Sequence, residues 1–400
     1  MNCNVAFYCG SFNPFTEGHR VCLCYVIAMY DRVIIGVGIN NDKKAWACLS
    51  QQQRVLLIKD SLADFVEMFK HRDLIGKEFS VMETIAAERL MSYPDCVKVV
   101  TYSCLTVDAA IRNGAGVLVR GERLVGDHDS EMQLAHVNSE LCKIRGYELQ
   151  TVLFPVSKVD LTYVSSSLVR TLINEGEYIA AMKYVSPSVH NFLCEEMLKN
   201  GEYDNITSGK RMHCANLIRS YRKNKYHNFS HVAYMLNFLK IFKIFNPEQH
   251  IHNKEIKFAT FWHDSLTTGY SPEECSAGYA WELAVKLGYD YPDLVKELIL
   301  ATDHKKEFDC QRLFDFALMH DLDLAILGDE QNYGLYSYLV MCEAGDNLCQ
   351  FEEYAVAREK FLGELLSKKR IFETEYFYNR FEKIARQNIS REKAFWQSKI

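Results

Sequence analysis

Five short apolar runs separated by helical patterns constrain the fold of the first half of the chain. They span residues 5–8, 33–37, 97–100, 117–119 and 149–153. Strands that alternate with helices form a parallel sheet whose two faces are covered by those helices. The chain is therefore expected to begin with an open α/β domain built on a parallel sheet.

Strand patterns fade in the second half, where helical periodicity takes over. Residues 230–245 and 273–287 place apolar side chains at helical spacing. Residues 271–274 (Ser-Pro-Glu-Glu) match a capping box with proline at the first helical position. The second half is therefore expected to be all-α.

Helix-start patterns and one polar stretch predict the domain limits. Residues 50–53 (Ser-Gln-Gln-Gln) match a capping box, and residues 186–187 (Ser-Pro) predict a helix that closes the first domain near position 200. The polar residues that follow are the predicted linker. A chain of 400 residues suits two cores, here predicted to span 1–200 and 209–400.

Composition excludes several classes of protein. A formal charge of −6 argues against a general nucleic-acid binder. We find no apolar run of transmembrane length and no signal-peptide pattern at the N-terminus. Fourteen cysteines occur without a Cys-x-x-Cys pair, which disfavours zinc clusters. The expectation is a cytoplasmic protein with reduced thiols and with neither nucleic-acid nor membrane partners.

The segment that leaves the first strand and enters the first helix, residues 8–19, is a candidate anion site. Gly10 permits close approach of the backbone to a ligand. The helix start offers free N–H groups and the positive end of the helix dipole. Thr16 and His19 lie one turn apart, so both can face one phosphate. Taken alone, this pattern is equally compatible with a structural turn.

Three more segments follow other strands. Residues 42–44 follow the second strand, residues 120–123 the fourth, and residues 165–170 the fifth. Ligands of open parallel sheets bind beyond the carboxyl ends of the strands, which is where all these segments are expected. Together they supply cations, hydroxyls and helix N–H groups, a combination suited to two phosphorylated ligands.

Residues 16–19 (Thr-Glu-Gly-His), 118–138 and 163–170 together resemble phosphopantetheine adenylyltransferase, a family of TxGH/HxGH nucleotidyltransferases. The resemblance covers roughly residues 1–198. It implies a Rossmann-like fold and adenylyl transfer from ATP, with Mg²⁺, to 4′-phosphopantetheine. The implied products are dephospho-coenzyme A and pyrophosphate. The family forms homo-oligomers, although a fused second domain could prevent this.

The resemblance also implies roles by position. The implied catalytic residues are His19, Lys43 and Arg120. His19 would donate a hydrogen bond rather than act as a base, because the substrate phosphate attacks in line and no protein nucleophile is needed. The implied contacts to ATP and its phosphates are Gly10, Ser11, Phe12, Thr16, His19, Arg123, Glu131, Ser165, Ser166, Ser167 and Arg170. The implied contacts to the phosphate acceptor are Ser11, Lys43, Arg120 and Asn138.

Some features depart from the family pattern. Cys9 stands where proline is frequent, Asn13 where aspartate is usual, and Glu122 where an apolar residue is common. Residues 64–95 are longer than the pattern and are predicted to be an inserted helical segment. The acceptor could therefore be another phosphate monoester, such as nicotinate mononucleotide. The cytidylyltransferase branch is disfavoured, because its Arg-Thr-x-Gly-Ile-Ser signature is absent. Roles outside catalysis are expected for Lys44, His128 and His136.

Histidines and aspartates recur along the helical half. His227 and His231 are four apart, hence on one helical face. They are followed by residues 263–264 (His-Asp), 303–305 (Asp-His-Lys) and 321–323 (Asp-Leu-Asp). Imidazole and carboxylate groups suit manganese, iron, magnesium or zinc bound with open positions.

The order of these clusters resembles the HD superfamily, in particular the predicted metal-dependent HD phosphohydrolases, over about residues 210–395. The resemblance implies a divalent metal held by His231, His263, Asp264 and Asp323, with Asp321 as an alternative to Asp323. The implied candidates for substrate contact are His227, His304 and Lys305, and a structural role for His227 is equally open. The substrate is undefined, and a regulatory module without turnover is the alternative.

Overall fold

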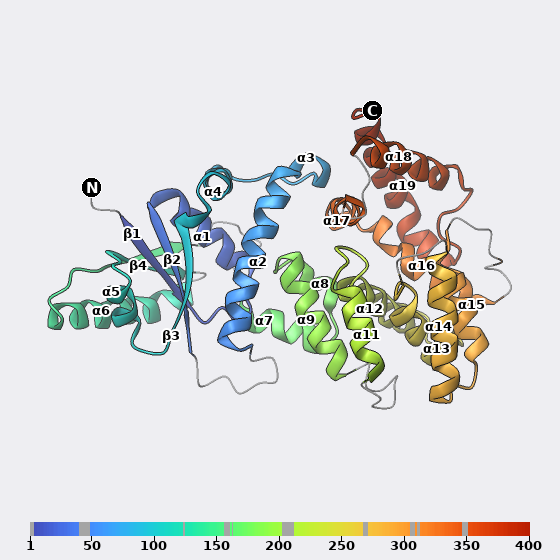
Figure 1. Cartoon of the computed structure of the whole chain (residues 1–400), viewed down its shortest axis with the longest axis horizontal. Coiled ribbons are helices and arrows are strands. Elements are labelled where there is room, and N and C mark those ends of the chain that lie inside the picture. Colours follow the sequence, from blue (N-terminus) through green and yellow to red (C-terminus); the bar gives the residue numbers. More distant parts are fainter. Residues whose placement is uncertain are drawn as a thin grey trace. The chain divides into compact units, whose positions relative to one another are not determined.

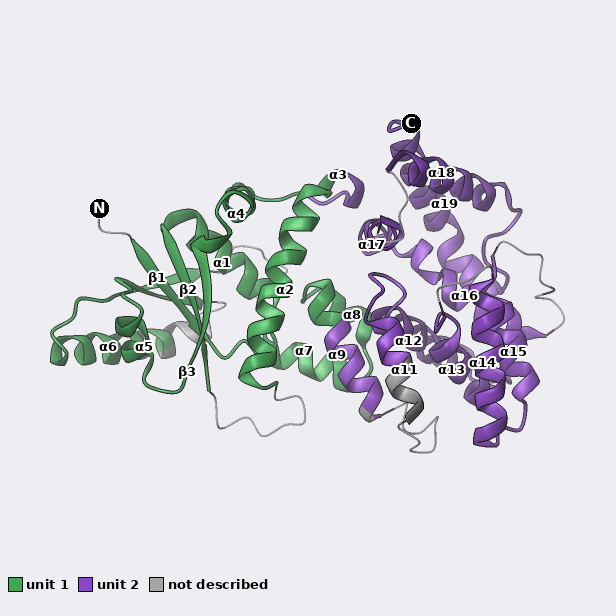
Figure 2. Ribbon diagram, in the orientation of Figure 1, with its two compact units in different colours: residues 1–72, 78–190 green, residues 73–77, 191–400 purple. Residues whose placement is uncertain are grey.

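The computed structural model of the chain describes residues 4–39, 49–122, 125–155, 161, 163–201, 212–266, 271–304, 309, 313–345 and 351–400. Two compact units make up the chain (Figure 1, Figure 2). Unit 1 comprises residues 1–72 and 78–190, and unit 2 comprises residues 73–77 and 191–400. The sequence-derived limits of 1–200 and 209–400 stay a prediction.

A five-stranded parallel sheet forms the centre of unit 1. Its strands are β1 (Val5–Gly10), β2 (Arg32–Gly38), β3 (Val97–Tyr102), β4 (Val117–Glu122) and β5 (Gln150–Pro155). The order in the sheet is β3-β2-β1-β4-β5, and every neighbouring pair is parallel. The predicted parallel α/β domain is confirmed, and each strand overlaps one of the five apolar runs.

Alternate side chains of the central strand enter two separate cores. Ala6 and Tyr8 of β1 face helices α1 (Glu17–Met29), α2 (Gln51–Lys70) and α4 (Val81–Ser92). Val5, Phe7 and Cys9 face α5 (Thr106–Arg112). Helix α6 (Val125–Ile144) packs on α5, β4 and β5. Both faces of the sheet are therefore covered, as parallel sheets require.

The predicted helical insertion at 64–95 contains the end of α2, the short α3 (Arg72–Ile75) and α4. A buried ion pair fixes α4 to α1: Nη2 of Arg20 lies 2.9 Å from Oε1 of Glu83, with side chains only 3% and 1% exposed. Arg20 also pairs with Glu17, and its guanidinium lies over the Phe65 ring. Burial would lower the pKa of Arg20, but the two carboxylates outweigh burial and raise it. This contact holds the helix that carries His19.

Replacing Glu83 by alanine is expected to destabilise unit 1 by about 3–5 kcal/mol, because the buried Arg20 charge would lose a partner. Hydrogen exchange of the β1 to β4 amides measures this loss. Glu88→Ala, on an exposed position of the same helix, is the matched control and should stay within about 0.5 kcal/mol of wild type. Equal exchange in the two variants would contradict a stabilising role for the ion pair.

Three helices complete unit 1 or lead out of it: α7 (Ser166–Asn174), α8 (Tyr178–Met182) and α9 (Pro187–Asn200). The described part of unit 2 contains helices joined by turns and no strand, which confirms the predicted all-α second half. Its helices are α11 (Met212–Tyr221), α12 (Phe229–Phe245), α13 (Asn253–Trp262), α14 (Pro272–Leu287), α15 (Pro292–Leu300), α16 (Phe314–Leu324), η3 (Ala325–Gly328), α17 (Tyr333–Gly345), α18 (Phe351–Ser367) and α19 (Glu375–Gln397). None of the described helices is long and apolar enough to cross a membrane.

The capping boxes differ in outcome. Ser50 accepts a hydrogen bond from the backbone N–H of Gln53, and Gln53 bonds back, so the box at residues 50–53 is confirmed. Helix α14 begins at Pro272 as predicted, but the Ser271 side chain makes no capping hydrogen bond. The box predicted at Ser271 is therefore wrong. The ψ angle of Ser271 is 78°, away from the extended backbone that aims an N-cap oxygen at the first turn.

Candidate functional site

The strand order creates a switch point between β1 and β4, since the sheet grows outward from β1 in both directions. Ligands bind beyond the carboxyl ends of parallel strands at such points. Gly10 ends β1 there and leads into the loop before α1, and Arg120 lies near the end of β4. The two strand ends meet through side chains, because Nη1 of Arg120 donates to Sγ of Cys9 at 3.6 Å.

Thr16 and His19 form a reciprocal capping box at the start of α1. The Thr16 side chain accepts from the backbone N–H of His19, and the Thr16 backbone N–H donates to Nδ1 of His19 at 3.0 Å. Because a backbone N–H can only donate, Nδ1 must be the accepting nitrogen of the ring. A neutral His19 then carries its proton on Nε2, which makes Nε2 a hydrogen-bond donor at the positive end of a helix.

Aromatic rings hold His19 in place. Its imidazole stacks on Phe15 with centroids 5.5 Å apart and meets the edge of Phe12 at 5.1 Å. Phe12 has a positive φ of 46°, and its ring is buried. A Cβ on Gly10 would lie 2.8 Å from that ring, so glycine is required at this turn. Since the Phe12 side chain is buried, only its backbone is available to a ligand.

The start of α7 is fastened to the same loop. Ser165 caps the helix by accepting from the Leu168 N–H at 3.0 Å. The hydroxyl of Ser166 donates to the carbonyl of Pro14 at 2.8 Å. Arg170 donates to the carbonyl of Asn13 and to Oγ of Ser167. The structure therefore brings together the first and last predicted phosphate-binding segments, which are about 150 residues apart.

Arg120 and Glu131 face each other as a bidentate pair. Nε and Nη2 of Arg120 donate to the two carboxylate oxygens of Glu131 at 2.6 and 2.8 Å. Burial would lower the pKa of Arg120, but the Glu131 hydrogen bonds and charge raise it, so the guanidinium stays charged. Asn138 lies two helical turns further along α6 and is half-buried. The backbone carbonyl of Ser11 accepts a hydrogen bond from Nη1 of Arg54.

Several residues singled out from the sequence lie outside the described part of the chain. Lys43, Lys44, Arg123 and Lys305 lie outside the described residues. The side chains of Glu122 and His128 are likewise outside the described set. His136 is exposed on α6.

Sequence reasoning missed Arg54, which lies in the first turns of α2. Its guanidinium is buried and donates to the carbonyls of Ser11 and Gly38. It thereby ties the β1 loop to the end of β2. A single arginine in a helix carries no sequence signal for such a contact, because both acceptors are backbone atoms far away in the chain.

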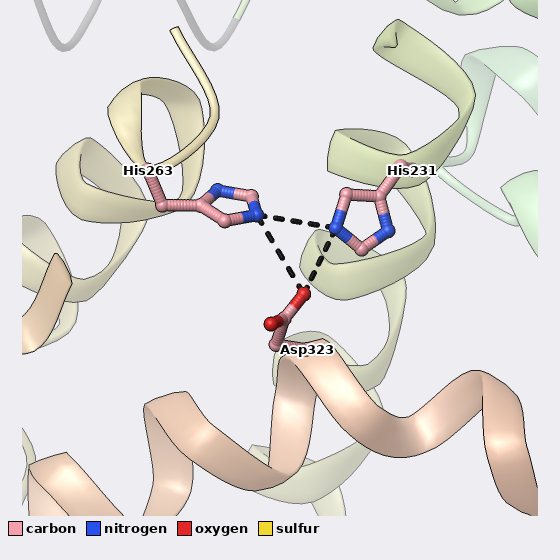
Figure 3. A group of neighbouring side chains, drawn as sticks. All are labelled: His231, His263 and Asp323. Atoms are coloured by element: carbon pink, nitrogen blue, oxygen red, sulfur yellow. Dashed lines mark hydrogen bonds and ion pairs between the residues drawn. The ribbon is translucent and has the colours of Figure 1, made fainter. Parts of the chain in front are cut away.

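In unit 2, three helices bring His231, His263 and Asp323 together (Figure 3). His231 comes from α12, His263 caps the end of α13, and Asp323 lies near the end of α16. Nε2 of His231 lies 3.1 Å from Nε2 of His263 and 3.0 Å from Oδ1 of Asp323. The third distance, from Nε2 of His263 to Oδ1 of Asp323, is 3.6 Å. These three residues form a group able to hold a metal ion.

Asp264 adds a fourth possible ligand atom, a carboxylate oxygen, to this group. Its Oδ2 lies 2.7 Å from Nε2 of His263 and 3.7 Å from Nε2 of His231. That oxygen is buried and has no hydrogen bond of acceptable geometry among the described residues. Nδ1 of His263 donates to the carbonyl of Thr260 at 2.9 Å, which fixes the orientation of the ring. Buried polar atoms without a partner call for an explanation, and two imidazoles with two carboxylates fit a divalent cation.

Asp321 and Asp323, which the sequence left as alternatives, have different environments. Asp321 is fully buried and accepts hydrogen bonds from the backbone N–H groups of Glu373 and Thr374 and from the Thr374 hydroxyl. It therefore anchors the start of α19. Asp323 faces the two histidines, and its Oδ2 lies 2.8 Å from Nε2 of His304.

The charges at this centre depend strongly on burial. Burial lowers the pKa of His231, and Asp323 only partly offsets this. Burial also opposes charge on His263, but Asp264 and Asp323 outweigh it and raise its pKa well above the ordinary value. Burial would raise the pKa of Asp264, but His263 and His227 hold it at about 2. The carboxylates thus favour a positive charge between them, as they would with a bound cation.

His227 has a partner that the sequence did not reveal. Glu343 of α17 lies 2.6 Å from Nδ1 of His227 and accepts from the backbone N–H groups of Tyr226 and His227. Burial lowers the pKa of His227, but Asp264 and Glu343 outweigh burial and raise it to about 9. Glu343 could not be found from spacing, because it is 116 residues away from His227.

Known proteins resemble the N-terminal portion of the chain. A family model described as cytidylyltransferase-like matches residues 7–172. Phosphopantetheine adenylyltransferase of Bartonella quintana is 32% identical over 189 residues, which are 47% of this chain and 91% of that relative. The enzymes of the same name from Phocaeicola vulgatus and Porphyromonas gingivalis are 31% and 32% identical, over 43% and 45% of this chain and 89% and 94% of their own lengths. Through this N-terminal portion, the chain belongs to the phosphopantetheine adenylyltransferase family.

Proposed function

We propose that unit 1 transfers the AMP moiety of ATP to 4′-phosphopantetheine, giving dephospho-coenzyme A and pyrophosphate. The observation that carries this proposal is the arrangement at the switch point. A hydrogen-bond donor on His19 lies in the first turn of α1, the helix that follows β1, and a charged guanidinium on Arg120 lies near the end of the adjacent strand β4. Family membership through unit 1 supports the choice of reactants.

The reaction requires positioning and charge stabilisation rather than a protein nucleophile. The acceptor phosphate attacks the α-phosphorus of ATP in line, and pyrophosphate leaves. In this proposal, His19 donates from Nε2 to oxygens that gain charge, while Arg120 and Lys43 hold the attacking phosphate beside the α-phosphate. The N-terminus of α7, with Ser165 to Ser167 and Arg170, holds the β- and γ-phosphates that ATP carries with Mg²⁺.

Acceptor choice is the direct test. With ATP and Mg²⁺, the purified chain is expected to release pyrophosphate much faster with 4′-phosphopantetheine than with nicotinate mononucleotide. The reason is the match of unit 1 to phosphopantetheine adenylyltransferases over most of their length. Side-by-side pyrophosphate assays at equal acceptor concentrations measure the ratio. Faster release with nicotinate mononucleotide would mean that this compound, and not 4′-phosphopantetheine, is the acceptor.

A second activity is proposed for unit 2: metal-dependent hydrolysis of a phosphate ester or anhydride. The convergence of His231, His263 and Asp323 with the buried Oδ2 of Asp264, which accepts no hydrogen bond of acceptable geometry from the described residues, carries it. A divalent cation bound there would supply Lewis-acid chemistry that polarises a phosphoryl oxygen and acidifies water. His263 is oriented for the cation by Thr260. His304 and His227, beside the carboxylates, are the side chains proposed to contact substrate.

Elemental analysis tests this second proposal. The whole chain, loaded with manganese and desalted, is expected to retain metal and to hydrolyse at least one member of a phosphoester and nucleotide panel. Metal binding with no turnover would favour the alternative of a regulatory module. A chain that retains no manganese would remove the metal site altogether.

A further inference from the structure

The guanidinium of Arg120 is held from two sides by residues of different elements. Glu131, on α6, receives Nε–H and one N–H of Nη2 with both carboxylate oxygens. Cys9, on β1, receives an N–H of Nη1 on its sulfur at 3.6 Å. Glu131 is mostly buried, with 15% of its side chain exposed, and Cys9 is buried. Such contacts restrict a long, otherwise flexible side chain to one orientation.

The contacts with Glu131 and Cys9 leave part of the Arg120 guanidinium available to a ligand. A guanidinium has five N–H groups, and Glu131 and Cys9 use three of them. Within the described part of the chain the remaining two, one on Nη1 and one on Nη2, make no hydrogen bond. The Arg120 side chain is 27% exposed although both of its partners are more buried. Two N–H groups of one guanidinium match two oxygens of a phosphate.

The thiol of Cys9 is suited to this place. Its S–H donates to the carbonyl of Val119 at 3.8 Å, so the sulfur lone pairs are directed at Arg120. Burial raises the pKa of Cys9, although Arg120 opposes this, and the thiol therefore stays neutral. A neutral acceptor orients the guanidinium without cancelling its charge. Cys9 is also the position at which this chain departs from the frequent proline of its family.

We propose that Glu131 and Cys9 are positioning residues that present to the phosphate of the acceptor the two N–H groups of Arg120 that bind no other described residue. The inference rests on the proposed adenylyl transfer. It differs from the role that resemblance implied for Glu131, namely contact with ATP. Both carboxylate oxygens of Glu131 are bound to Arg120, so Glu131 acts on the acceptor through that side chain.

Steady-state kinetics separate the two roles. Glu131→Gln keeps the shape of the side chain but replaces one acceptor oxygen by a donor, which opposes a guanidinium. We expect the KM for 4′-phosphopantetheine to rise about tenfold or more, the effect of losing one charge-assisted hydrogen bond, with the KM for ATP within about twofold. Cys9→Ala should raise the acceptor KM about threefold, because a bond to sulfur is weaker. Glu140→Gln, on an exposed position of α6, and Cys142→Ala, a buried thiol of α6, are the matched controls.

Chemical rescue provides a readout that a merely structural role would not change. In Arg120→Ala, guanidinium ion added below denaturing concentrations is expected to restore part of the adenylyl transfer. The reason is that Glu131 and Cys9 still form a binding site for the ion. The double variants Arg120→Ala/Glu131→Gln and Arg120→Ala/Cys9→Ala should show less rescue. Equal rescue in all three variants would overturn the proposal.

Two kinetic results for Glu131→Gln would overturn this role of Glu131. A raised KM for ATP in Glu131→Gln would return Glu131 to the ATP side. A lowered KM for the acceptor would mean that Glu131 competes with the substrate for Arg120. If wild type releases no pyrophosphate with 4′-phosphopantetheine, the proposed function fails instead. Calorimetry then measures the affinity for inorganic phosphate. Weaker phosphate binding by Glu131→Gln than by wild type supports the positioning role of Glu131, and equal binding overturns that role.

Discussion

Replacing His19 by alanine is expected to lower adenylyl transfer by about 10²–10³ in kcat, the usual cost of removing one preorganised donor from a developing charge. The capping box directs Nδ1 of His19 to the Thr16 N–H, so the donor that is lost is Nε2–H. Pyrophosphate release under saturating ATP and acceptor measures the effect. The rest of unit 1 should remain folded, because the Thr16 hydroxyl still accepts from the backbone of residue 19.

Two further variants make this test selective. His19→Gln places an amide N–H where Nε2–H stood, and it should lose less activity than alanine if donation is the role. A general base could not be replaced in this way, since an amide takes up no proton near neutral pH. His136→Ala, on an exposed position of α6, is the control histidine and should retain wild-type turnover. Wild-type rates in His19→Ala would remove His19 from the mechanism.

Loss of Asp323 is expected to abolish manganese retention by unit 2. Its Oδ1 lies within reach of both histidines, and no other described carboxylate except Asp264 approaches them so closely. Replacement of groups that merely support metal ligands costs about 10–100-fold in affinity, so loss of a ligand itself should exceed that range. Asp323→Ala is therefore expected to hold almost no metal after desalting, as measured by elemental analysis of the whole chain.

Asp321→Asn is the contrasting variant. Asp321 binds the backbone at the start of α19 rather than His231 or His263, so its loss should lower stability and leave metal affinity nearly unchanged. Metal content is compared below the melting transition of the variant. If Asp321→Asn lost the metal while Asp323→Ala retained it, the assignment of the two aspartates would be reversed.

Local sequence determined most of the elements in both units. Short apolar runs predicted five parallel strands, because a strand buried on both faces needs no polar alternation. The capping box at Ser50 formed because both partners belong to the same turn. Ser271 shows the limit of this reasoning, since a side chain caps a helix only when the preceding backbone takes an extended conformation.

Tertiary structure alone decided how the sites are assembled. Asp321 and Asp323 are two residues apart on one helix and therefore point to different sides, so spacing could not say which one faces the histidines. Glu131 contacts Arg120 because α6 packs beside β4. Glu343 contacts His227 from a helix that is far away along the chain. The sequence by itself determined the strands, the helices and the residue types suited to phosphate and metal. Which of those side chains share a partner depends on contacts between elements far apart in the chain, and no periodicity records such contacts.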